Sequence, residues 1–115
     1  RLEDARNEAN HPETRLEQAY HAILNSSLAG LRANGLRPTD RRGHHMVALE
    51  SLSGTLGIPD DRVDYYQMLR GLRNKDLYTG GIHVTVRQAE EAIAEAQALR
   101  SELEQWLGER AASSL

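Results

Sequence analysis

The segment from Tyr65 to Tyr78, YYQMLRGLRNKDLY, holds the residue types best suited to chemistry. On a helix that advances about 100° per residue, Arg73 falls near the centre of a broad apolar face. The other members of that face are Val63, Tyr66, Leu69, Leu72 and Leu77. A buried guanidinium is costly unless it is paired. Either Asp76 neutralises Arg73, or this face opens into a pocket or a subunit interface.

The simpler alternative is a structural one. Arg73 and Asp76 are spaced i,i+3, so they can pair on one helix while the arginine stem packs and its charged end reaches water. In the neighbouring pair of tyrosines, one side chain is expected in the core and the other at its rim, although tyrosines can also stack on bases.

The histidines predict no metal site. His44 and His45 are adjacent, so on a helix they point about 100° apart and do not suit a single metal ion. The chain contains no cysteine, which excludes thiolate metal sites and cysteine nucleophiles. No cofactor is expected. His21, His44 or His83 could still supply a proton-transfer group.

The composition predicts one globular domain. The chain has 115 residues, of which 39% are hydrophobic and 27% charged, and its formal net charge is −3. An acidic protein has no overall positive field to hold nucleic acid, so such a role needs a local patch, either at Arg41 and Arg42 or at Arg70, Arg73 and Lys75. No apolar stretch approaches the length of about 20 residues that spans a membrane, and a cytoplasmic location is expected.

Leu, Ala, Ile and Val must build the core because phenylalanine is absent and Trp106 is the single tryptophan. Apolar residues at three- and four-residue steps predict four long helices. Their expected bounds are Pro12 to Gly35, Thr39 to Gly57, Pro59 to Leu77 and Val86 to Leu107. Thr85 and Gln88 form a capping box before the last helix, which is expected to end at Gly108.

Residues 1–10 could be the end of a further helix, and residues 111–115 are expected to form a frayed tail. Short connections predict an all-α, antiparallel up-and-down bundle of four or five helices. The domain covers residues 1–115 with its core in 13–107. We expect a homodimer whose interface contains Tyr66, Leu69, Arg73 and Asp76.

The order of several motifs resembles a HEPN domain, the family named for higher-eukaryote and prokaryote nucleotide-binding proteins. Ala19-Tyr20-His21-Ala22 is similar to the family's AYYA segment, and Gly35 to Pro38 form a similar GLRP turn. Arg73 and Asn74 match the first two positions of the family's arginine–polar–histidine motif. The polar helix start at His44 and the segment Glu90-Glu91-Ala92 also match, so the resemblance covers roughly residues 13–107.

The chain departs from the nuclease-type members at the motif histidine, where it has Tyr78. The resemblance implies that two subunits join their motif residues to cleave RNA without metal, with arginine stabilising the developing charge. Tyrosine is a poor base because its ordinary pKa is near 10. The implied site is Arg73, Asn74 and Tyr78. RNA or nucleotide binding is expected at Arg70, Arg73, Lys75, Tyr20 and His21.

The leading hypothesis is an RNA- or nucleotide-binding component of a bacterial toxin–antitoxin or defence-type system, with a degenerate ribonuclease site. A small nucleotidyltransferase is the partner that the resemblance implies. One alternative is a module that only dimerises or binds a partner. The other is an active, metal-independent endoribonuclease that uses a histidine outside the motif.

Overall fold

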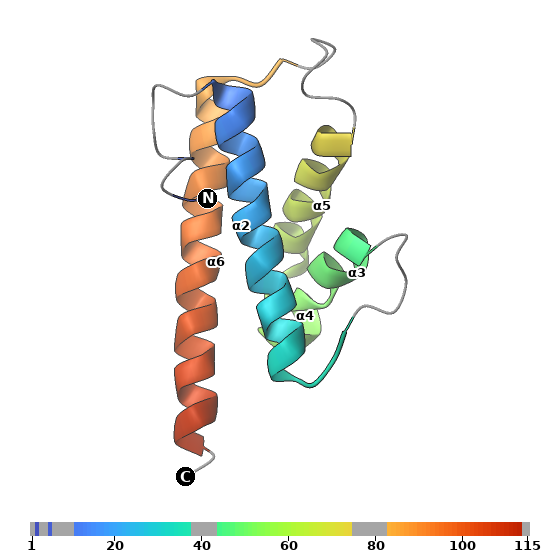
Figure 1. The fold of residues 1–115 in the computed structure, drawn as a ribbon, viewed down its shortest axis with the longest axis vertical. Helices are drawn as coiled ribbons and strands as arrows, with labels where there is room; N and C mark the ends of the chain where they lie inside the picture. Colours follow the sequence, from blue (N-terminus) through green and yellow to red (C-terminus); the bar gives the residue numbers. More distant parts are fainter. Residues whose placement is uncertain (1, 3–4, 6–10, 38–43, 75–82, 114–115) are drawn as a thin grey trace.

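The structure, a computed structural model, describes residues 2, 5, 11–37, 44–74 and 83–113. All regular structure in these residues is α-helical, which confirms the predicted fold class (Figure 1). The helices are α2 (Pro12–Ala33), α3 (His44–Glu50), α4 (Leu52–Thr55), α5 (Asp60–Asn74) and α6 (Val86–Ser113). None of the described helices is both long and apolar enough to cross a membrane.

The central packing unit is the pair α2 and α6, which run side by side in the same direction (Figure 1). Near their carboxyl ends, Arg110 of α6 donates a hydrogen bond to the carbonyl oxygen of Ala33 at 3.1 Å. The prediction of an antiparallel up-and-down bundle is therefore wrong for this pair. The short helices α3 and α4 make no full pass along the molecule, and of the described helices it is α5 that returns the chain to the end from which α2 started (Figure 1).

The core lies between α2, α5 and α6 and is built mainly from aliphatic side chains and alanine. Its largest fully buried side chains include Tyr20, Tyr66, Leu16, Ile23, Leu69 and Leu99. Small residues let the helices approach closely: a Cβ on Gly30 would lie 3.0 Å from Cδ1 of Leu56. Two residues of the amino-terminal segment, Leu2 and Ala5, are also buried in this core.

The structure confirms some predicted helix ends and corrects others. The capping box is present, because the amide of Gln88 donates to Oγ1 of Thr85 at 3.1 Å and the amide of Thr85 donates to Oε1 of Gln88 at 2.9 Å. The expected second helix is interrupted at Ser51, whose hydroxyl donates to the carbonyl oxygen of Ala48 at 2.6 Å.

The last helix is longer than predicted. Gly108 lies inside α6, and residues 111–113, expected in a frayed tail, are helical. Val86 and Leu107, the apolar residues that bound the predicted helix, are 54% and 38% exposed. A single glycine lowers helix propensity by only about 1 kcal/mol, and the strong helix formers around it outweigh that cost.

Candidate functional site

Arg73 lies in the last turn of α5, and its side chain extends toward α2. Its Nε is 3.6 Å from Oε1 of Glu17, and its guanidinium carbon is 5.8 Å from the ring centroid of Tyr20. The Nε atom is buried and has no hydrogen-bond partner among the described residues. The contact with Glu17 is thus an ion pair without a hydrogen bond. The expected partner, Asp76, lies outside the described residues.

Tyr20 connects Arg73 to α3. Its ring is fully buried and its hydroxyl lies 3.0 Å from Nδ1 of His45, within hydrogen-bond distance. Burial raises the pKa of Tyr20 to about 12, although Arg73 and Arg70 oppose that rise. Tyr20 therefore stays a neutral phenol at physiological pH and cannot act there as a base.

The surroundings of His45 alter its titration. Burial lowers its pKa, and coulombic interactions with Arg73, His44, His21 and Arg70 lower it further. His45 is consequently a neutral imidazole at neutral pH. Its hydrogen bond to Tyr20 fixes the ring, and a neutral ring can accept a proton at one nitrogen.

Further cationic or titratable groups complete this cluster. Nε2 of His21 lies 3.7 Å from Glu17, and the rings of His44 and His45 are 5.9 Å apart. Nε of Arg70 donates to Oε1 of Gln67 at 2.8 Å. We call this group the Arg73 cluster, comprising Glu17, Tyr20, His21, His44, His45, Arg70 and Arg73. Two arginines, Arg70 and Arg73, face one described carboxylate, Glu17, in a protein whose net charge is −3.

The cluster suits an anion better than a metal ion. Guanidinium groups bind phosphate and carboxylate through paired N–H donors, whereas a divalent metal requires several carboxylate or neutral imidazole ligands. Within the described ranges, no group of three or more histidine and acidic side chains could hold a metal ion.

The structure brings together four of the residues predicted to bind RNA or a nucleotide: Tyr20, His21, Arg70 and Arg73. Asn74 is the last residue of α5. Lys75, Asp76 and Tyr78 fall outside the part of the chain that the structure describes. His83 is exposed just before α6, with no described contact to the cluster.

Tyr66 and Leu69, predicted to lie in a dimer interface, are 0% and 1% exposed within a single chain. This corrects the predicted interface, because neither side chain is accessible to a second copy. The apolar face of α5 packs on the chain's own core instead. Tyr65 is only partly buried, so the two adjacent tyrosines divide between rim and core as predicted.

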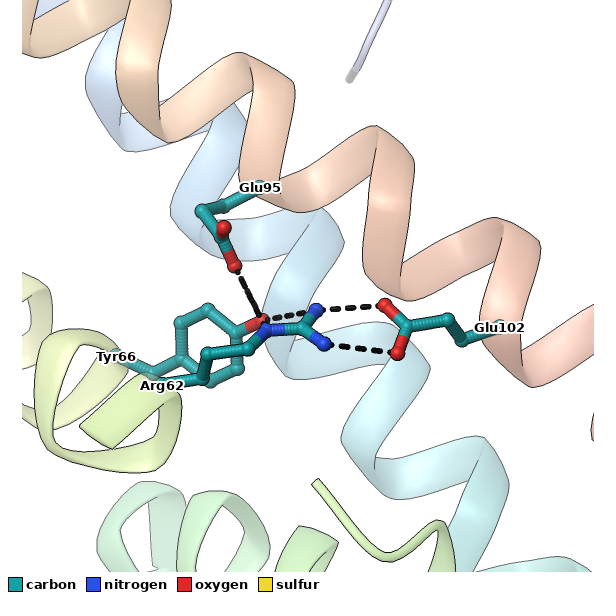
Figure 2. A network of polar contacts seen from close by, with 4 residues as sticks. All are labelled: Arg62, Tyr66, Glu95 and Glu102. Carbon is teal, nitrogen blue, oxygen red and sulfur yellow. Dashed lines mark hydrogen bonds and ion pairs between the residues drawn. The ribbon is translucent and has the colours of Figure 1, made fainter. Parts of the chain in front are cut away.

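Sequence reasoning missed a second polar network, which joins α5 to α6 (Figure 2). Arg62 donates from Nη2 and Nη1 to the two carboxylate oxygens of Glu102 at 2.6 and 2.8 Å. The Tyr66 hydroxyl donates to Oε1 of Glu95 at 2.8 Å and accepts from Arg62 at 3.1 Å. The i,i+4 spacing of Arg62 and Tyr66 was visible in the sequence, but nothing local indicated which acidic residues of another helix they meet.

The network is internal to the protein and places one cation, Arg62, between two carboxylates, Glu95 and Glu102. Hydrogen bonding to Glu102 raises the pKa of Arg62, and burial raises the pKa of Tyr66. Each described polar group in the network already has a protein partner, so the network stabilises the packing of α5 against α6 and does not offer a binding site.

Comparisons with protein-family models, curated proteins and solved structures found no match to this chain.

Proposed function

We propose that the Arg73 cluster binds a phosphate group of single-stranded RNA or of a nucleotide, without catalysing a reaction on it. The observation that carries this proposal is the position of Arg73. Its buried Nε has no hydrogen-bond partner among the described residues, and it lies amid other cationic or titratable side chains. Such a guanidinium has unused donor capacity in a locally positive environment, which is the chemistry that a phosphate requires.

Glu17 is a weak competitor for an incoming phosphate. Its carboxylate is 3.6 Å from Nε of Arg73 and 3.7 Å from Nε2 of His21, beyond good hydrogen-bond distance in both cases. A phosphate brings more acceptor oxygens and more negative charge than one carboxylate. Binding can therefore add charge-assisted hydrogen bonds while Glu17 keeps the empty site from excessive repulsion among its cations.

The biological setting of the proposal comes from the resemblance to HEPN domains. On that basis the chain is a catalytically degenerate component of a bacterial toxin–antitoxin or defence-type system. A homodimer and a small nucleotidyltransferase partner belong to the same proposal. Because Tyr66 and Leu69 are buried within a single chain, other residues must form the interface of such a dimer.

One observation favours a second candidate function, metal-independent RNA cleavage. His45 is neutral at neutral pH and belongs to the same cluster as Arg73. In that reaction the 2′-oxygen bonds to phosphorus, its proton passes to an imidazole, and the bond to the 5′-oxygen breaks as that oxygen takes a proton. The absence of the motif histidine places this function second.

The test uses a fluorescently labelled oligouridylate of about 4 nucleotides, with binding followed by anisotropy and cleavage by gel. Arg73→Ala is compared with Arg100→Ala, which makes the same charge change at an exposed pair with Glu104 on α6. Loss of charge-assisted hydrogen bonds worth about 1.5–3 kcal/mol predicts at least about tenfold weaker binding for Arg73→Ala. The control is expected to bind like wild type.

Wild-type binding that Arg73→Ala leaves unchanged would overturn the proposed site. No binding by the wild type would favour the module that only dimerises or binds a partner. Cleavage that is lost in both Arg73→Ala and His45→Gln would show instead that the second candidate function is correct. Circular dichroism of each variant verifies that it is folded.

A further inference from the structure

A separate basic groove lies where the chain leaves α2 and approaches α3. It has a volume of about 560 Å³ and is lined by Leu28, Arg32, Gly35, Leu36, Arg37 and His44. Two arginines, one histidine and two leucines therefore face the same space, and no acidic side chain is among its described lining residues. We call it the Arg32–Arg37 groove.

The end of α2 creates this groove. Gly35 has φ +71°, and the amide of Leu36 donates to the carbonyl oxygen of Leu31 at 3.0 Å, which reverses the chain after the helix. The reversal leaves Leu36 54% exposed and places Arg37 beside it. The groove thus combines an exposed apolar side chain, Leu36, with two arginines that can donate hydrogen bonds to phosphate.

The groove adjoins the Arg73 cluster through its histidines. His44 lines the groove, its ring lies 5.9 Å from that of His45, and His45 contacts Tyr20. The guanidinium of Arg73 is in turn 5.8 Å from the Tyr20 ring. Cationic or titratable side chains thus follow one another from the end of α5 across α3 to the end of α2.

We infer that the Arg32–Arg37 groove is a second subsite for single-stranded RNA, and that it holds a stretch of the strand whose phosphate lies at Arg73. This inference rests on the proposed function. Arg32 and Arg37 bind phosphate oxygens, while Leu28 and Leu36 provide an apolar surface for a base or ribose. The presence of both arginine and leucine side chains in the groove suits the phosphates and bases of a strand better than an acidic peptide, which offers carboxylates but no bases.

The inference makes the dependence on strand length the decisive measurement. We expect an oligouridylate of about 4 nucleotides to occupy the Arg73 cluster without reaching Arg32 and Arg37, and one of about 12 nucleotides to reach both arginines as well. Anisotropy titrations of both labelled strands at several salt concentrations give their affinities and salt slopes. The variants are Arg32→Ala/Arg37→Ala, its control Arg87→Ala/Arg100→Ala on α6, and Arg73→Ala.

We expect the groove variant to bind the shorter strand like wild type and the longer strand at least about tenfold more weakly. Its salt slope for the longer strand should fall by about 1.4, since each lost phosphate contact to a single strand contributes about 0.7. Arg32→Lys/Arg37→Lys should recover most of the salt slope, because it keeps the charge. The α6 control should bind both strands like wild type.

Equal binding of the longer strand by wild type and the groove variant would overturn the inference. Equal losses for the two strands would overturn it too, because the groove would then not be a separate subsite. In a further outcome, only Arg73→Ala weakens binding of the shorter strand, and wild type binds the longer strand no more tightly than the shorter one. That result would leave the proposed function standing and would overturn the second subsite. A labelled polyglutamate peptide that binds more tightly than the longer strand, and is lost in the groove variant, would assign the groove to an acidic protein segment.

Discussion

Two arginines on α5, Arg62 and Arg73, have the same side chain and opposite surroundings. They are three helical turns apart and so project from nearly the same side of the helix. Arg62 meets Glu95 and Glu102 of α6 and the hydroxyl of Tyr66 (Figure 2). Among the described residues, Arg73 meets one carboxylate, Glu17, at 3.6 Å, together with other cationic or titratable groups.

The difference separates an arginine that holds the fold from one that is available to a ligand. The guanidinium of Arg62 uses its donors within the protein, on one carboxylate oxygen of Glu95 and both of Glu102. Nε of Arg73 is buried without a described hydrogen-bond partner, which costs free energy that a bound anion could recover. Residues that form a binding site often stabilise the empty protein less than other residues at the same positions would.

Replacing each arginine by alanine tests this comparison most directly. Arg62→Ala leaves Glu95 and Glu102 without their cation, and after allowance for their partial exposure we expect a loss of about 2 kcal/mol in the free energy of unfolding. Arg73→Ala should cost less than about 1 kcal/mol, because it also relieves repulsion among cations. Urea denaturation followed by circular dichroism measures both, with Arg100→Ala as the control. Equal losses for the two variants would contradict the comparison.

Removing the carboxylate beside Arg73 tests whether Glu17 competes with a bound anion for this arginine. Glu17→Gln keeps the shape of the side chain but deletes the negative charge that competes with a bound anion. A partly screened charge pair is worth up to about 1 kcal/mol, so we expect the shorter oligouridylate to bind about threefold more tightly. Glu104→Gln, at the exposed pair with Arg100, is the matched control. Weaker RNA binding by Glu17→Gln would show that Glu17 helps to form the site instead.

The smallest expected effect is a pH dependence of stability that arises from His45. Its pKa is lowered in the folded state by burial and by Arg73, so the unfolded state binds more protons as the pH falls below about 6.5. The stability contributed by neutral His45 is complete above that pH and is lost as the pH falls toward its folded pKa. Urea denaturation between about pH 7.5 and 5.5 should therefore show decreasing stability on acidification.

His45→Gln isolates this contribution, because His21 and His44 remain in the variant. The difference in slope between wild type and His45→Gln belongs to His45. Arg73→Ala should reduce the slope as well, since Arg73 is one of the charges that lower the pKa of His45. An unchanged slope in His45→Gln would mean that other groups account for the acid sensitivity.

Local patterns in the sequence predicted the helices well. The capping box at Thr85 and Gln88 and the glycine after α2 act within a few residues, so the sequence contains all that is needed to read them. The break at Ser51 was missed because its hydroxyl competes for a backbone carbonyl without disturbing the apolar period. The parallel course of α2 and α6 was missed because it depends on how far α3 and α4 travel, which no local pattern encodes.

The candidate site was predictable only in part for the same reason. The helical period placed Arg73 on an apolar face, and the structure confirms that it is partly buried with 30% of its side chain exposed. Its described partners, Glu17 and Tyr20, come from α2, more than fifty residues away in the sequence. The pairing of Tyr20 with His45 depends on the docking of α3, so the sequence alone could not select His45 from the other histidines.

The parallel course of α2 and α6 also has an electrostatic consequence. The macrodipoles of the two helices point the same way, so the partial negative charges at their carboxyl ends gather at one end of the molecule. Arg110 lies there in the last turn of α6, stacks on Trp106 with its guanidinium carbon 4.5 Å from the ring, and donates to the carbonyl oxygen of Ala33. One cation thus neutralises two helix ends. The final turns of α2 and α6 should fray and re-form as one cooperative unit, with shared protection of their amides against hydrogen exchange.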